Sequence, residues 1–313
     1  MILYYALGRQ AMCEGLRILG ATVGSRIAVP RFICSDVVAS LSHEGYITVP
    51  YEIRRDLQAD VASPRPTAEY IILVNYFGFA ADVDLVANTW GFTRRQILED
   101  NAHGLFSRDS NDCLLGQRTA VGFTSFRKSI RVRDGGMLLI NDASLANIAE
   151  FQKLTPVSRQ TPRSLTFRRL SVALSKRSGI PLMNIARGAK RKVLRTIPQA
   201  FDPESRVPSA VSVTSLAALR LCDATTESER RRALYRALVP VVEDCGAEIL
   251  FDRLPDGVVP YALPFLAPQT TVRRVRRALW LRNLEVFPWP DLPPDDSLSP
   301  NWQHQLHLVS FLE

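Results

Sequence analysis

The chain is poor in the residues that build disulfide frameworks and metal clusters. Its five cysteines are an odd number, widely spaced, and none forms a Cys-x-x-Cys pair. That usage argues against a disulfide framework or a zinc site and fits a reducing cytoplasm. Of the four histidines, His304 and His307 stand three residues apart, but no carboxylate or cysteine motif accompanies them. We therefore expect no metal site.

Long apolar runs and nucleotide-binding loops are also lacking. No run approaches the ~18–20 residues of a membrane-spanning helix. The apolar start, Met1 to Leu7, has no basic leader and is soon followed by Arg9, so we expect a buried first strand or an interface segment rather than a signal peptide. Neither a Walker loop nor Gly-x-Gly-x-x-Gly is present, which leaves nucleotide binding by those loops unsupported. Hydrophobic content of 46% and charged content of 22% are typical of an ordinary globular protein of one or two domains.

Acidic residues are absent from residues 151–200, whose basic side chains more than account for the chain's net charge of +8. One interpretation is a solvated basic face, because like charges repel. The other is an electropositive surface for a polyanionic substrate, such as a nucleotide diphosphate sugar, or for an acidic carrier protein. The segment argues against nucleic acid as a partner, since aromatic residues do not interleave with the basic ones as a base-stacking platform requires. The basic residues are Lys153, Arg159, Arg163, Arg168, Arg169, Lys176, Arg177, Arg187, Lys190, Arg191, Lys192 and Arg195.

Strand-like and helical stretches alternate along the first half of the chain. We expect strands near residues 26–30, 46–50, 70–75, 96–100, 120–126 and 136–141, and helices at 10–20, 35–44 and 82–90. Such alternation predicts an α/β fold with a mostly parallel central sheet and helices on both faces. We expect a large domain over residues 1–200. Residues 201–313 should form a small C-terminal α+β domain, with strands near 247–251 and 260–266 and a helix near 271–283.

Two chemical residues follow neighbouring strands of this predicted sheet. The apolar run Ile97-Leu98-Glu99 ends on Asp100, and Lys128 lies in a Ser-Phe-x-Lys turn after the next strand. Ligands of parallel sheets bind at the carboxyl ends of the strands, so we expect Asp100 and Lys128 to converge there. A helix that opens at Gly8 presents backbone N–H groups to an anion.

Five short elements, in order, resemble those of the DegT/DnrJ/EryC1/StrS sugar aminotransferases, which have the fold-type-I architecture of enzymes that use pyridoxal 5'-phosphate (PLP). The resemblance runs from about Gly8 to Asp142 and returns more faintly from about Ser209. The elements are Gly8-Arg9-Gln10-Ala11, Pro30 to Cys34, Phe77 to Asp84, Glu99 to His103, and Thr124 to Lys128 followed by Asp134-Gly135-Gly136.

The resemblance assigns roles to individual residues. It implies that the amine of Lys128 forms a Schiff base with the cofactor aldehyde and that Asp100 keeps the pyridine nitrogen protonated. The corresponding structural alternatives are a surface lysine and a helix cap. The remaining candidates for cofactor binding are Gly8, Arg9, Gln10 and Ser125 at the phosphate, Phe32, Cys34 and His103 beside the ring, and Asn75 at the ring hydroxyl.

The chain departs from the family pattern on the substrate side of the site. Cys34 stands at or near the position of a ring-stacking aromatic, and His103 stands where glutamine is usual. The family's Asn-Tyr-Arg element, which reaches into the neighbouring subunit's site, has no clear counterpart; residues 206–209 occupy its place.

The resemblance implies a homodimeric aminotransferase that uses an amino donor and a keto acceptor, either a keto-sugar nucleotide or a related ketone of secondary metabolism. Two alternatives stay open. One is another PLP reaction, such as decarboxylation, elimination or carbon–carbon bond formation, and the other is a non-catalytic, truncated relative.

Overall fold

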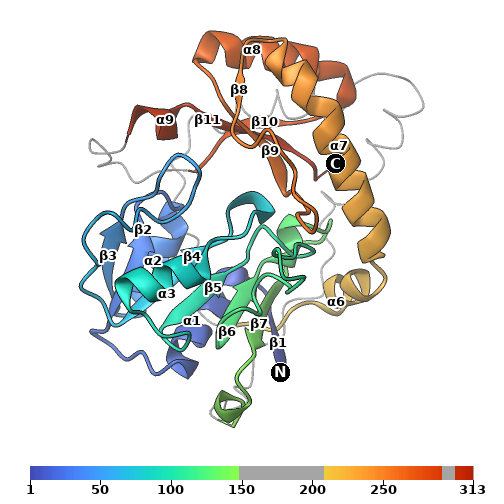
Figure 1. The fold of residues 1–313 in the computed structure, drawn as a ribbon. Helices are drawn as coiled ribbons and strands as arrows, with labels where there is room; N and C mark the ends of the chain where they lie inside the picture. The colour runs from blue at the N-terminus through green and yellow to red at the C-terminus, as the bar shows by residue number, and fades with distance from the viewer. Residues whose placement is uncertain (148–207, 291–299, 313) are drawn as a thin grey trace.

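The computed structural model describes residues 1–147, 208–290 and 300–312, which form two sheets with their helices (Figure 1). The expected domain boundary at residue 200 and the basic segment 151–200 lie outside the described residues. The large sheet is built from residues 2–140, and the small sheet from residues 248–310.

The large sheet has the order β1-β7-β6-β5-β4-β2-β3. Neighbours from β3 to β6 pair in parallel, whereas β7 is antiparallel to both β6 and β1. The expected α/β class with a mostly parallel sheet is confirmed, and all six predicted strands of this half are present. The strands are β1 (Ile2–Tyr5), β2 (Arg26–Pro30), β3 (Ile47–Tyr51), β4 (Tyr70–Val74), β5 (Ile97–Asp100), β6 (Val121–Thr124) and β7 (Gly136–Ile140).

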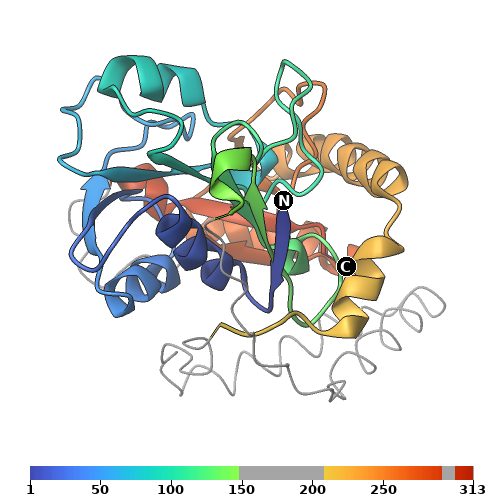
Figure 2. The same cartoon turned by 90° about the horizontal axis from the view of Figure 1, so that it is seen from below.

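Helices cover both faces of this sheet. The helices α1 (Gly8–Ile18) and α2 (Ser35–His43) lie on one face and α3 (Val83–Trp90) on the other (Figure 2). Helix α1 packs closely because Gly15 faces the strands: a Cβ there would lie 3.0 Å from side-chain atoms of both Leu98 and Leu138. Helix α3 starts where the Asp82 carboxylate accepts the N–H of Leu85, and it ends at Gly91 in the left-handed conformation.

The first strand differs from expectation in its burial. The segment does form β1, but β1 is an edge strand, and Met1 and Ile2 are 44% and 47% exposed. Burial begins only at Tyr5. A strand with one paired edge buries fewer side chains than a central strand. The expectation of a buried first strand was therefore wrong at its start, and that of an interface segment stays a prediction.

The small sheet is antiparallel throughout, with the order β10-β11-β9-β8. The strands predicted near residues 247–251 and 260–266 and the helix predicted near 271–283 are present, whereas β10, β11 and the short helix before β11 were not foreseen. The elements are α6 (Val213–Arg220), α7 (Ala224–Glu243), β8 (Glu248–Ile249), β9 (Ala262–Leu266), α8 (Gln269–Ala278), β10 (Val286–Pro288), α9 (Asn301–His304) and β11 (Leu306–Ser310).

Short 3-10 turns connect several elements, and two of them follow strand ends: η1 (Tyr76–Gly78) after β4 and η2 (Phe126–Lys128) after β6. Two others are η3 (Ala143–Leu145) and η5 (Trp280–Arg282). None of the described helices is long and apolar enough to cross a bilayer. Within the described ranges, no three His, Cys, Asp or Glu side chains gather closely enough to hold a metal ion.

Candidate active site at the strand ends

Alternation along β5 sends its last two carboxylates to opposite faces of the sheet. Leu98 lies against α1, so Asp100, two residues on, shares the α1 face, whereas Glu99 points to the opposite face. The pairing of Asp100 with Phe123 in β6 places Ser125 and Lys128 just beyond the same edge. The two residues expected to carry the chemistry therefore do converge at the carboxyl ends of parallel strands.

Asp100 is held in a low-dielectric position. Its side chain is 6% exposed, and its Oδ1 accepts the backbone N–H of Ala102 at 2.8 Å. Burial raises the pKa of Asp100 to about 6, against the lowering effects of the Ala102 hydrogen bond and of Lys128. The carboxyl is thus a buried anion with one backbone donor and a lysine nearby, which suits it to pair with a cationic ligand.

Lys128 ends η2, which begins directly after β6. Its backbone N–H donates to the Ser125 carbonyl at 2.9 Å, which closes the turn. The Nζ atom lies 3.1 Å from Nε2 of His103. Burial lowers the pKa of Lys128, although the Cys34 thiol and Asp100 act in the opposite direction. A lysine in this setting loses its proton more readily than an exposed one, and the neutral amine is the nucleophilic form.

The start of α1 lies against Ser125. A Cβ added at Gly8 would lie 2.9 Å from the Ser125 Cβ, so only glycine allows this approach. The predicted phosphate residues Gly8 and Ser125 are therefore brought together at a helix N-terminus. The neighbouring side chains have structural partners as well: Arg9 pairs with Asp36 at 2.8 Å, and the Gln10 Oε1 accepts the Leu7 N–H at 3.2 Å.

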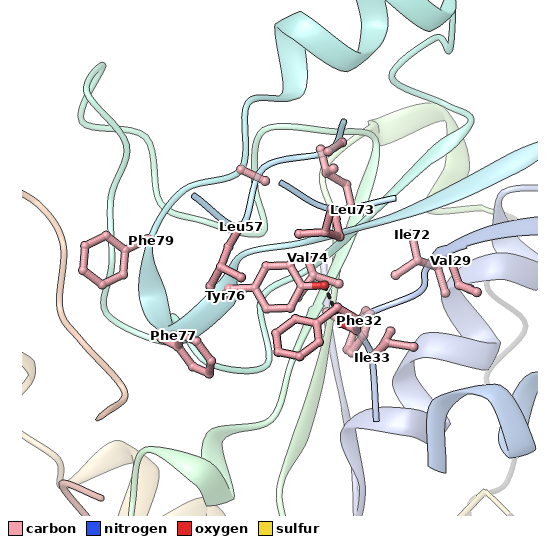
Figure 3. Close-up of a cluster of buried hydrophobic side chains, with 14 of the residues drawn as sticks. Val29, Phe32, Ile33, Leu57, Ile72, Leu73, Val74, Tyr76, Phe77 and Phe79 are labelled. Atoms are coloured by element: carbon pink, nitrogen blue, oxygen red, sulfur yellow. Dashed lines mark hydrogen bonds between the residues drawn. The ribbon is translucent and has the colours of Figure 1, made fainter. Parts of the chain in front are cut away.

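Of the two residues expected beside the ring in the Pro30 loop, Cys34 lies near Lys128 and Phe32 belongs to the core. Phe32 is fully buried in the cluster drawn in Figure 3, and its backbone carbonyl accepts the Tyr76 hydroxyl at 2.6 Å. Its ring also packs against Trp289 and Trp302 of the C-terminal half, with a distance of 5.3 Å between ring centroids in each pair. Cys34 caps the start of α2 and is near enough to Lys128 to affect the pKa of the amine.

Asn75 lies at the same edge but on the opposite face. Its Nδ2 donates to Glu99 at 2.8 Å, and its Oδ1 accepts both the Ala81 N–H and the Arg118 guanidinium. The side chain is fully buried within these contacts. Because they turn the amide away from Lys128, we leave Asn75 out of the cofactor site proposed below.

His103 is held edge-on toward Lys128. Its ring is stacked on two aromatic rings: the centroid of Phe77 lies 5.6 Å away with an interplanar angle of 19°, and that of Tyr261 lies 4.6 Å away at 16°. Because these rings already pack against the imidazole, we expect His103 to lie beside a cofactor ring rather than to stack on it.

Tyr261 was missed by the sequence analysis. It lies just before β9, far downstream of every motif in the site, and no local pattern marks it. Arg231 of α7 was missed for the same reason: its buried guanidinium donates to the carbonyl oxygens of Ser129 and Tyr261, which joins the lysine turn to the small sheet.

The family model for the DegT/DnrJ/EryC1/StrS aminotransferases matches residues 5–170, more than half of the chain. The chain belongs to the DegT/DnrJ/EryC1/StrS aminotransferase family. The matched range includes Gly8, Asp100 and Lys128, the residues that the strand ends gather into one site.

Similar proteins agree with this assignment. The 3-amino-5-hydroxybenzoate synthase of Amycolatopsis mediterranei is 25% identical over 142 residues, which span 43% of this chain and 36% of the relative. Among solved structures, S. venezuelae DesV in complex with a ketimine intermediate has a TM-score of 0.64 at 19% identity, covering 100% of this chain and 80% of that one. The E. coli GDP-4-keto-6-deoxy-D-mannose-3-dehydratase with bound hydrated PLP has a TM-score of 0.61 at 14% identity, covering 99% and 82%. At these identities the structural likeness establishes the fold.

Proposed function

We propose that the chain is a PLP-dependent aminotransferase that acts on a keto-sugar nucleotide or a related ketone of secondary metabolism. The observation that carries the proposal is the convergence of Asp100 and Lys128 on the α1 side of the sheet, in a chain of this aminotransferase family.

The residues present fit the cofactor. The amine of Lys128 is in place to bind an aldehyde, and the Asp100 carboxylate is a buried anion that suits a protonated pyridine nitrogen. The Gly8 turn, closed on Ser125, offers a helix N-terminus and a hydroxyl to a phosphate. When bound, PLP supplies the electron sink that lets a substrate carbon lose and regain a proton.

The protein's own residues divide the remaining work. Lys128 would hold the cofactor through its amine and, once free, would move a proton at Nζ between substrate and cofactor. Asp100 keeps the ring nitrogen charged, and Cys34 lies beside the amine. Desolvation and the like charge of Arg9 lower the pKa of Arg127. Asp36 pairs with Arg9 at 2.8 Å and also acts on Arg127. A phosphate or a substrate carboxylate would be a second anion for these two guanidiniums, and we assign Arg9 and Arg127 to it.

A second candidate function is elimination on the same scaffold. It is favoured by a specific observation: one structural neighbour is a 3-dehydratase with bound PLP. The cofactor site does not separate the two, because the reaction depends on which substrate bond stands perpendicular to the ring.

The test begins with cofactor attachment. The purified protein should be yellow, and borohydride reduction followed by mass spectrometry should place the cofactor on Lys128. Lys153 is an internal control, and Lys128→Ala should lose the label and about 10²–10⁴-fold of the activity.

Incubation with amino donors should then convert PLP to its pyridoxamine form. Labelling elsewhere, or no cofactor after reconstitution, would refute the assignment. A loss of water from substrate without that conversion would favour elimination.

We also propose a homodimer in the cytoplasm, with the site at the subunit interface. Five free thiols support a reducing compartment. The exposed Met1 and Ile2 of edge strand β1 offer a contact surface. Light scattering should give a dimer at working concentration, and a fully active monomer would contradict it.

For the acceptor we propose a polyanion, drawn to the basic segment 151–200. Its apparent affinity should then fall as salt rises, since a Debye length of about 8–10 Å near physiological ionic strength screens exposed charges. Replacing Lys190, Arg191 and Lys192 with Gln should reproduce the high-salt affinity at low salt. If neither the rise in salt nor the triple replacement changes catalytic efficiency, the segment is only a solvated basic face.

A further inference from the structure

The two nitrogens of His103 face two different partners. Nδ1 lies 3.5 Å from the backbone nitrogen of Phe77, and Nε2 lies 3.1 Å from Nζ of Lys128. A backbone N–H can only donate, so Nδ1 must be the acceptor in that contact. Burial lowers the pKa of His103 well below its ordinary range, so the ring is neutral and has one proton. That proton must therefore be on Nε2.

This tautomer restricts what Lys128 can be. An Nε2–H donates, so the lysine nitrogen 3.1 Å away must accept, and only the neutral amine has a lone pair. An ammonium has only N–H donors, so at this contact its hydrogens would face the Nε2–H of His103. The histidine thus favours the uncharged amine over the ammonium.

The ring is also fixed in its plane. Phe77 and Tyr261 stack on the imidazole, and Trp289 packs edge-on against it with a centroid distance of 5.4 Å and an interplanar angle of 70°. Tyr261 and Phe77 are themselves joined, since the Tyr261 N–H donates to the Phe77 carbonyl at 2.8 Å. The imidazole cannot tilt without breaking this stack, and a flip within its plane would lose the Phe77 N–H contact, so its donor stays directed at Lys128.

We propose that His103 is a positioning residue that holds the Lys128 amine neutral and nucleophilic, with its tautomer set by the Phe77 N–H and its orientation set by Tyr261 of the C-terminal half. The proposal rests on the proposed function only where that amine captures an aldehyde. The effect itself, which is that His103 disfavours protonation of Lys128, can be measured in the protein without cofactor.

Other charged or titratable groups act on the same amine. Asp100 from β5, Cys34 before α2 and Asp36 in α2 favour the ammonium, whereas Arg127 in η2 opposes it. The histidine therefore works with burial and Arg127 against three groups that would charge the lysine. Removing the Nε2–H donor of His103 should therefore raise the pKa of Lys128 by a measurable amount.

Glutamine is the discriminating replacement. Its amide can rotate to present either an N–H or a carbonyl oxygen, so it can hydrogen-bond the neutral amine or the ammonium. His103 in this tautomer can only donate. We therefore expect His103→Gln to raise the Lys128 pKa by about one unit, which corresponds to about tenfold less neutral amine at a given pH below it.

The experiment uses the protein stripped of cofactor. Competitive labelling with a trace of acetic anhydride across pH, read by mass spectrometry, gives the titration midpoint of Lys128, with Lys153 as reference in the same digest. The wild type and His43→Gln, a control at an exposed histidine, should share a low midpoint. His103→Gln should have a higher one, and Tyr261→Leu should shift it in the same direction. An unchanged midpoint in His103→Gln overturns the proposal.

A measurement on the unmodified chain covers the case in which a variant does not fold. Nitrogen-15 NMR of the imidazoles should show one histidine that keeps a proton on Nε2 and none on Nδ1 through neutral pH. A protonated Nδ1 on His103 refutes the tautomer. If the protein binds no PLP but the Lys128 midpoint still depends on His103, the cofactor proposal fails while this inference stands.

Discussion

Glu99 and Asp100 are neighbours in one strand, yet their carboxylates lie in opposite environments. Glu99 is fully buried on the α3 face, where it accepts Asn75, the Arg118 guanidinium and the Arg118 backbone N–H, and it pairs with Arg118 at 2.7 Å. Asp100, on the α1 face, has one backbone donor and a lysine nearby. Protein donors fill the acceptor sites of the Glu99 carboxylate, whereas the Asp100 carboxylate can still accept further hydrogen bonds.

The difference teaches how one strand end serves both stability and chemistry. A buried charge is tolerable when its partners are complete, which describes the network of Asn75, Glu99 and Arg118. A buried carboxyl with few donors has a raised pKa and attracts a cationic ligand. Alternation along the strand separates the two tasks by one residue, so a one-residue change should separate their effects.

The largest expected effect is on stability, from Glu99→Gln. The substitution keeps the shape but leaves the Arg118 charge buried without its anion, which costs about 3–5 kcal/mol. Urea unfolding measures this loss. Glu248→Gln is the matched control, because its pair with Arg55 is more than half exposed and contributes about 1 kcal/mol or less. Activity per bound cofactor should stay near normal in both variants, and a large drop in Glu99→Gln would place Glu99 in the chemistry.

Asp100→Asn should show the reverse pattern. The amide cannot hold the pyridine nitrogen protonated, so we expect turnover to fall by about 10²–10³-fold, the effect of removing one preorganised electrostatic group. Unfolding free energy without cofactor should not fall, because burial disfavours the charge that is removed. Reduction with borohydride should still attach the cofactor to Lys128. Near-normal turnover would show that the acid partner lies elsewhere.

A smaller effect is expected from Asn75→Ala, which decides the face to which Asn75 belongs. The change leaves Glu99 short of one donor and the Ala81 N–H short of its acceptor, at a cost of about 1–3 kcal/mol. The visible band of the bound cofactor should not move. Asn141→Ala is the control, since its amide donates to the carbonyls of Gly116 and Thr119 in the loop before β6. A shifted band in Asn75→Ala alone would return Asn75 to the cofactor site.

The sequence predicted well what depends on local pattern. Alternating strands and helices predicted the sheet, and a strand-end acid with a lysine turn predicted that Asp100 and Lys128 meet. It did not predict on which face of the sheet a side chain beyond a strand end lies, as Asn75 shows. Nor could it find Tyr261 or Arg231, which reach the site only because the small sheet packs against the large one. Contacts between elements far apart in sequence leave no periodic signal in either segment.

The smallest effect separates the two carboxylates by pH. Asp100 has a folded-state pKa of about 6, above its ordinary 3.8. Between those values the folded chain retains a proton that the unfolded chain has released, so the Asp100 contribution to stability rises as pH falls from 6 to 4. The unfolding free energy of the cofactor-free wild type relative to Asp100→Asn should follow that direction. Cofactor affinity should change oppositely, because protonation of Asp100 removes its ion pair with the protonated pyridine nitrogen. It should weaken by about tenfold per pH unit below 6 in the wild type and lose that component in Asp100→Asn, which shares every other titrating group. Parallel pH profiles for the two proteins would show that Asp100 is not the group that binds the ring nitrogen.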